Sequence, residues 1–313
     1  MPAARLAGTL SIFSTGAIVG AAASLAGGAW VVDRITACPD CVPFTQGLHP
    51  WQIAIIVMAL PGLLFGALAI LVAEPARQHD RRAESESGLG ETLRMISARR
   101  GFYIAHFLGF SLLNILCAGW LAWVPSFLIR THGWSLARTG FTLGVVSLAG
   151  GLIGMVGSGH LADHLYRKGV LDAHLRLYVW AAAVLGIAGI AATLATTTWL
   201  LITAMLVIAT ISSFIAVAAA ALQITSPPRA RGKVSALFLA IYNILGFGLG
   251  PAIIAFTGDT VLGDEHKLWL ALLIHFAVFA PLCALAFAFG LRPMRTLVAE
   301  RQGVRRDHRS MSL

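Results

Sequence analysis

The sequence has little charge, since Asp, Glu, Lys and Arg make up 12% of its 313 residues while 58% are hydrophobic. A soluble domain carries about 25% charged residues, and a disordered chain is poor in apolar side chains. The composition therefore excludes both classes. The sequence also lacks segments of about ten residues with alternating polarity, which excludes a porin-type barrel.

Charged residues are absent from seven long windows, namely 6–32, 51–73, 101–129, 139–162, 177–228, 234–258 and 268–291. A bilayer core needs about 20 apolar residues per helix, so six windows predict one span each. The longest window predicts two spans, divided near residues 196–199. The first window is too long for the apolar region of a signal peptide and is counted as a span. We therefore predict an all-α polytopic membrane protein with eight transmembrane helices.

The net charge of +9 reflects 23 basic residues against 14 acidic ones. If alternate loops face the same side, 19 of the basic residues lie on the side of both termini and 4 on the other. The positive-inside rule then predicts a multi-pass inner or plasma membrane protein with cytoplasmic N- and C-termini. This topology, together with contact with anionic lipid headgroups, accounts for the excess of basic over acidic residues, so we expect no nucleic-acid partner.

The first two predicted helices resemble a copy of the last two. The matched pairs are Arg5 with Arg231, Gly20 with Gly246, Trp51 with Trp269 and Pro75 with Pro293. Chance similarity is the alternative. If the repeat is real, the chain divides into a two-helix remnant of an N-terminal half (1–73), a cytoplasmic linker (74–100), a complete six-helix half (101–291) and a basic cytoplasmic tail (292–313), which we expect to be disordered.

The loop after the fourth predicted helix reads GHLADHLYRK at residues 159–168. It resembles the Gly-x-x-x-Asp-Arg-x-Gly-Arg-Lys signature of the major facilitator superfamily, from which His164 and Tyr166 depart. EPAR at residues 74–77 resembles the exit from the family's sixth helix, and NILGFGLGP at residues 243–251 resembles its eleventh. The resemblance implies helices five to twelve of a twelve-helix transporter, with the first four missing from this sequence. Residues 227–251 most resemble the spinster-like branch, which includes lipid and lysolipid transporters.

In the family this loop latches one half of the transporter onto the other. The resemblance therefore implies a gating role for four residues, which are Gly159, Asp163, Arg167 and Lys168. Pseudo-symmetry would direct Asp163 toward Arg5. The alternative is a solvated loop whose basic residues only orient the chain.

Candidates for a substrate cavity are polar or aromatic residues deep in the spans, namely His106, Asn114, Trp120, Tyr242 and Asn243. The family's seventh and eleventh helices, to which these residues correspond, border its cavity. An amide at this depth needs a partner, which a solute, water or a neighbouring helix can supply. For Trp120 an interfacial aromatic belt is the alternative.

No predicted span contains an interior Asp, Glu, Lys or Arg. Such groups persist within membranes where function requires them. Proton coupling would therefore depend on His106, His275 or the missing helices, and transport is otherwise uncoupled.

Small residues along the spans predict close helix packing at Gly20, Gly154, Gly246 and Gly250, while Pro251 permits bending. Cys38 and Cys41 fall in the first outer loop, where a local disulfide or two free thiols are expected. A zinc site there would need two further ligands, and His49 is the only histidine near.

The sequence predicts secondary transport of a small organic or amphipathic solute by alternating access. The alternative is a truncated membrane protein that transports nothing and acts at most as an assembly partner. Expected partners are the solute, the bilayer and either a missing N-terminal half or a second copy. No nucleophile with its base, paired carboxylates or metal cluster can be brought together, so we expect no enzyme, no cofactor and no metal.

Overall fold

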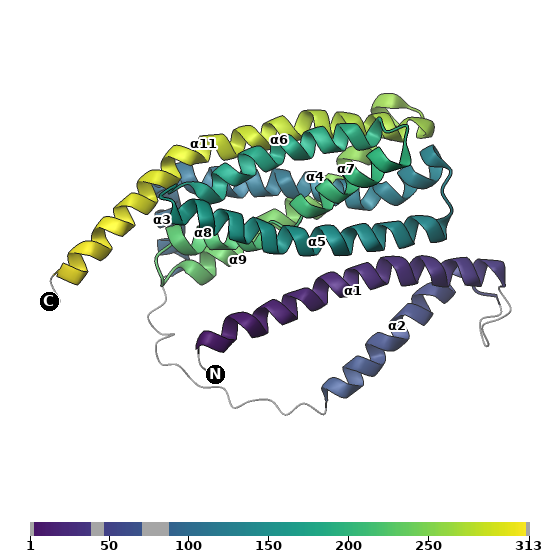
Figure 1. Ribbon diagram of the computed structural model, residues 1–313, viewed down its shortest axis with the longest axis horizontal. Coiled ribbons are helices and arrows are strands. Elements are labelled where there is room, and N and C mark those ends of the chain that lie inside the picture. The colour runs from purple at the N-terminus through teal and green to yellow at the C-terminus, as the bar shows by residue number, and fades with distance from the viewer. Residues whose placement is uncertain (1–2, 39–46, 71–87, 311–313) are drawn as a thin grey trace. The chain divides into compact units, whose positions relative to one another are not determined.

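The computed structural model describes residues 3–38, 47–70 and 88–310, and this part of the chain is helical with short connections (Figure 1). The α-helices are α1 (Ala3–Ala37), α2 (Pro50–Ala69), α3 (Leu89–Ala98), α4 (Arg100–His132), α5 (Leu136–Arg167), α6 (Ala173–Thr193), α7 (Thr198–Ile211), α8 (Ile215–Thr225), α9 (Arg231–Asn243), α10 (Gly250–Phe256) and α11 (Leu268–Ser310). Two π-helical segments, η3 (Ile244–Leu249) and η4 (Thr257–Leu262), and one 3₁₀ turn, η5 (Glu265–Lys267), complete the order. The predicted all-α class is confirmed.

Seven helices in the described part of the chain are long and apolar enough to cross a membrane. They cover every predicted span except the first, and the longest window is indeed divided between Thr193 and Thr198. The first predicted span falls in α1, where the side chains of residues 3–15 lie outside the described set. The total of eight therefore stays a prediction.

Contacts divide the chain into two compact units, of which the smaller comprises residues 1–84 and 128–148. Within it, α1 and α2 enclose a small apolar cluster around Ile35 and Ile53. The first turns of α5 approach α1 closely, because a Cβ on Gly144 would lie 2.9 Å from the carbonyl oxygen of Ala22. Small residues let these two helix backbones touch.

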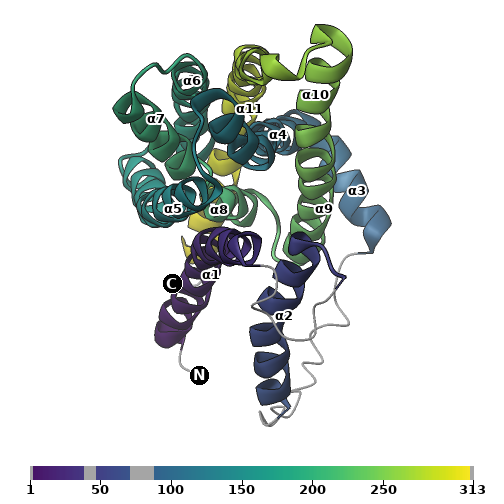
Figure 2. The same cartoon turned by 90° about the vertical axis from the view of Figure 1, so that its right-hand side faces the viewer.

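The larger unit comprises residues 85–127 and 149–313. Within it, α6 packs along α11, and the two helices lie side by side in Figures 1 and 2. Glycines on α6 make this approach possible, since a Cβ on Gly186 would lie 2.7 Å from the Cβ of Ala280. At Gly189 a Cβ would overlap the ring of Phe276, so this position accepts only a hydrogen as its side chain.

The helix from Arg231 to Leu262 is continuous but not uniform, because η3 and η4 interrupt its α-helical geometry. Pro251 lacks an N–H group and its ring clashes with the carbonyl of the preceding turn, which an α-helix cannot accommodate without distortion. Three glycines precede this proline at alternate positions from residue 246. They offer little resistance to the wider turn of a π-helix, so η3 forms directly before Pro251.

The structure differs from the sequence-based expectation at both charged segments. The second half of the expected linker contains α3, and α11 continues through the expected disordered tail to Ser310. The extension of α11 is stabilised by burial of its apolar face, which includes Met294 and Val298. Hydropathy windows missed this extension because Arg292 and Arg295 interrupt the apolar run.

Candidate functional site

The inward face of α4 is filled by aromatic side chains in the larger unit. Phe110 is fully buried, and its ring centroid lies 4.8 Å from those of His106 and Phe287 and 5.1 Å from that of Tyr178. Phe238 on α9 is packed against the same cluster, 4.9 Å from His106. The predicted cavity residue His106 is thus enclosed by rings, and its Nε2 lies 3.0 Å from the carbonyl oxygen of Ala218.

Two side chains of α4 are hydrogen-bonded to the backbone of the helix that contains η3. Asn114 Nδ2 donates to the carbonyl oxygen of Tyr242, and Trp123 Nε1 donates to that of Pro251, both at 3.0 Å. Of the partners considered for Asn114, namely a solute, water or a neighbouring helix, the structure shows a neighbouring helix. The hydrogen bond of Trp123 was not predictable from the sequence, because its acceptor lies 128 residues away.

The other cavity candidates differ in exposure. Trp120 is buried, with its ring centroid 5.7 Å from that of Phe276 on α11. Tyr242 is half-buried and stacks on Phe238 at 5.5 Å. Asn243 is exposed, and its Nδ2 donates to the carbonyl oxygen of Leu239 in its own helix at 2.7 Å. Among the described residues these side chains therefore do not converge on one polar cavity.

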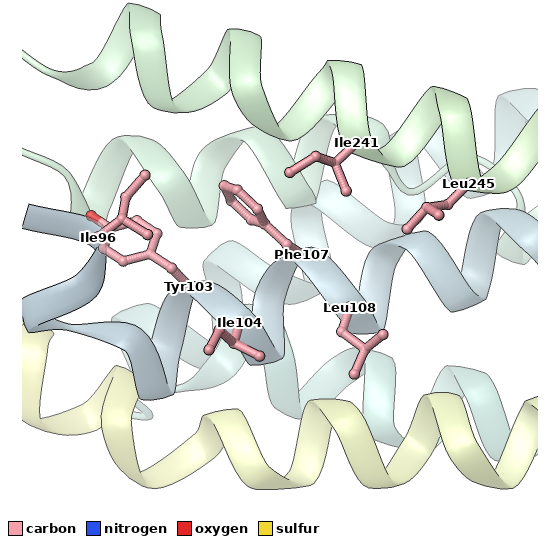
Figure 3. Close-up of a pocket in the computed structure, with 7 residues that line it drawn as sticks. All are labelled: Ile96, Tyr103, Ile104, Phe107, Leu108, Ile241 and Leu245. Carbon is pink, nitrogen blue, oxygen red and sulfur yellow. The ribbon is translucent and has the colours of Figure 1, made fainter. Parts of the chain in front are cut away.

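An apolar groove lies instead on the side of α4 that faces α9 (Figure 3). Its volume is about 230 Å³, and it is lined by Ile96, Tyr103, Ile104, Phe107, Leu108, Ile241 and Leu245. Figure 3 shows Phe107 of α4 and Ile241 of α9 pointing toward each other across it. The groove offers almost no polar surface, because the only hydroxyl among its lining side chains, that of Tyr103, lies 3.0 Å from Ser226 Oγ.

The predicted gating loop lies at the end of α5. Asp163, Arg167 and Lys168 are exposed, and Gly159 is half-buried with open space where a Cβ would be. The side chain of Arg5 lies outside the described residues, so the latch between Asp163 and Arg5 stays a prediction.

A buried ion cluster near this loop was missed by the sequence analysis. Asp172 is 1% exposed, and its Oδ2 accepts hydrogen bonds from Arg295 Nε at 2.6 Å and Arg176 Nη2 at 3.1 Å. This carboxylate therefore ties the start of α6 to the extension of α11. The spacing of Asp172 and Arg176 by four residues was an available signal for a helical ion pair, whereas the contact with α11 was not visible in sequence.

Three of the predicted packing glycines have close neighbours. A Cβ on Gly154 would overlap the carbonyl oxygen of Thr210, one on Gly246 would overlap Asn114, and one on Gly250 would lie 2.7 Å from the carbonyl oxygen of Ile115. At Gly20 no described atom lies within 4 Å of that position.

The cysteines of the first outer loop are only partly described. Cys41 lies outside the described residues, so its pairing with Cys38 stays a prediction. Cys117 and Cys283 are free and buried. Within the described ranges, no group of three or more His, Cys, Asp or Glu side chains is arranged to hold a metal ion.

Comparison with known proteins gives one family match and a set of similar structures. Residues 1–171 match the family model described as Major Facilitator Superfamily. Two crystal structures of a bacterial homolog to the human lysosomal transporter Spinster are similar in fold, one inward-facing and unoccupied, the other inward-facing and occupied. The identities are 19% and 17% and the TM-scores 0.68 and 0.62. Each alignment covers 96% of this chain; it covers 73% of the chain in the unoccupied structure and 68% of the chain in the occupied structure. No curated protein matches the sequence.

Proposed function

The chain belongs to the Major Facilitator Superfamily, a family of multi-pass membrane transporters, and on this premise we propose that it moves a small amphipathic or organic solute by alternating access. The single observation that carries the amphipathic class is the apolar groove between α4 and α9. Transporters of this architecture bind their substrates between helices near the bilayer midplane. The groove lies between helices of the larger unit and is lined by side chains of α3, α4, α9 and η3.

The chemistry of the groove favours an alkyl chain over a sugar or an ion. Its walls are aliphatic and aromatic, and the Tyr103 hydroxyl is already paired with Ser226. A polar solute would lose hydrogen bonds to water there without replacement, whereas an alkyl chain would not. Ile104 and Leu108 are 58% and 46% exposed, so the groove is open along one side and can admit a chain laterally.

Uptake into proteoliposomes tests the transport proposal. We expect the purified 313-residue protein to move a fluorescent single-chain amphiphile faster than protein-free vesicles and to leave a hexose unmoved. Protein that transports neither probe and binds neither would overturn the proposal. It would leave the second interpretation, a membrane protein without transport activity that assembles with another half or a second copy.

Filling the groove should weaken binding of the same amphiphile. Leu245 lines the groove and is half-buried, so Leu245→Trp places an indole where the alkyl chain would lie. We expect the dissociation constant, measured by fluorescence anisotropy in nanodiscs, to rise at least about tenfold, or roughly 1.4 kcal/mol.

The adjacent residue Ile244 supplies a matched control, because it is 70% exposed and does not line the groove. Ile244→Trp should change the dissociation constant less than about twofold. Equal effects of the two substitutions, in proteins of equal thermal stability, would remove the groove as the binding site.

We further propose that both termini are cytoplasmic, since most basic residues lie on that side of the predicted topology. In a variant with Cys38 and Cys41 replaced by serine, a cysteine added after Leu313 should react with a membrane-impermeant maleimide only after the cells are permeabilised. Labelling of intact cells would reverse the proposed orientation.

A further inference from the structure

The helix from Arg231 to Leu262 contains a segment of irregular geometry that is contacted closely by α4. This segment is η3, a π-helix in which the backbone hydrogen bonds span five residues instead of the four of an α-helix. The wider turn has poorer packing along its axis, and Pro251 removes one backbone donor just beyond it. Such a segment tends to return to α-helical geometry, or to bend, unless contacts from outside oppose the change.

Two side-chain donors of α4 oppose it, one on each side of η3. Asn114 bonds the carbonyl oxygen of Tyr242 before the segment, and Trp123 bonds that of Pro251 after it. Asn114 and Trp123 are separated by the same number of residues as Tyr242 and Pro251. Both hydrogen bonds can therefore form at the same time, in a single register of the two helices. A change in the number of residues per turn within η3 would move one acceptor away from its donor.

Close backbone contacts between the two bonds reinforce this alignment. A Cβ on Gly119 would lie 3.0 Å from the carbonyl oxygen of Gly250, and a Cβ on Gly250 would lie 2.7 Å from that of Ile115. At the other end, Gly246 leaves no room for a Cβ beside the amide of Asn114. The α10 end is thus held by backbone contact, while the α9 end is held by the Asn114 side chain and by Phe238, which is buried against His106 and Phe107.

We propose that η3 is a hinge between α9 and α10, and that Asn114 and Trp123 are positioning residues that keep it in the π-helical form. On one side of the hinge α9 carries the groove residue Ile241, and Leu245 lies in the hinge itself. Bending at η3 therefore changes the width of the groove. The hinge itself is independent of the transport proposal, because it follows from the backbone and the two hydrogen bonds alone.

Hydrogen exchange of the full chain in nanodiscs tests the hinge. Asn114→Leu removes one donor, and Trp123→Phe removes the other while keeping an aromatic ring. Each should accelerate exchange of the backbone amides of residues 244–250 by roughly tenfold, because each removes one hydrogen bond that opposes opening. Exchange in α6 and α11 should stay unchanged.

Asn243→Leu is the matched control, since the Asn243 amide bonds its own helix and is exposed. It should leave the exchange of residues 244–250 within about twofold of the unmodified protein. The hinge is refuted if either donor variant leaves this segment unaffected, or if exchange rises equally in all helices, which would indicate general destabilisation.

Discussion

Phe110→Ala is expected to destabilise the larger unit by about 3 to 5 kcal/mol, the range for truncating a buried aromatic side chain. The Phe110 ring is fully buried, and it contacts rings from three other helices through Tyr178, Phe238 and Phe287. These rings are anchored in α6, α9 and α11, so they cannot all move inward to fill the space. Unfolding in mixed micelles of increasing denaturing detergent measures the loss.

The same substitution on the lipid-facing side of the bundle provides the control for Phe110. Phe289 on α11 is 77% exposed, so Phe289→Ala should change the free energy of unfolding by less than about 0.5 kcal/mol. If the two alanine variants unfold at the same detergent concentration, the aromatic cluster is not the core of this unit.

Gly154→Ala is expected to cost about 2 to 3 kcal/mol, although it adds one methyl group. The new Cβ would overlap the carbonyl oxygen of Thr210 and lie 3.0 Å from the Cβ of Ser213. A backbone carbonyl within α7 cannot rotate away as a side chain can, so α5 and α7 must separate. Separation would also break the hydrogen bond from Ser213 Oγ to the carbonyl oxygen of Gly151, which is 3.2 Å long.

Gly157 lies one turn further along α5 and gives the opposite expectation. No described atom lies within 4 Å of its Cβ position, so Gly157→Ala should be neutral or should stabilise the helix by up to about 1 kcal/mol. The thermal melting temperature should therefore fall for Gly154→Ala and stay the same or rise for Gly157→Ala. A similar loss at both positions would mean that helix geometry alone, and not contact with α7, decides the result.

Several elements were predictable because their signal is local. The charge-free windows located the seven described spans, and the turn residues 196–199 divided the longest window correctly. The GHLADHLYRK segment and the likeness of residues 227–251 to the spinster-like branch indicated the family before any comparison. The match to the family model and the similar fold of the bacterial Spinster homolog agree with that recognition.

Other features escaped prediction because their partners are distant in sequence. Asp172 lies between two predicted spans, yet its carboxylate is buried against Arg295, 123 residues away. The extension of α11 beyond residue 291 escaped for the same reason. Local hydropathy counts Arg292 and Arg295 as the end of a span, while the ion pair with Asp172 allows the helix to continue.

The sequence by itself determined that this chain crosses a membrane as helices and belongs to a transporter family. The physical reason is that a backbone in lipid has no water and must pair its own N–H and C=O groups, which a helix does. The side chains of such a helix must be apolar over its length, so the spans are visible as long apolar runs in the sequence. Only the tertiary structure decided what the polar side chains within those runs do. Asn114 and Asn243 have the same chemistry, but one bonds a helix 128 residues away and the other its own helix. That choice depends on which helix backbones glycine allows to come into contact.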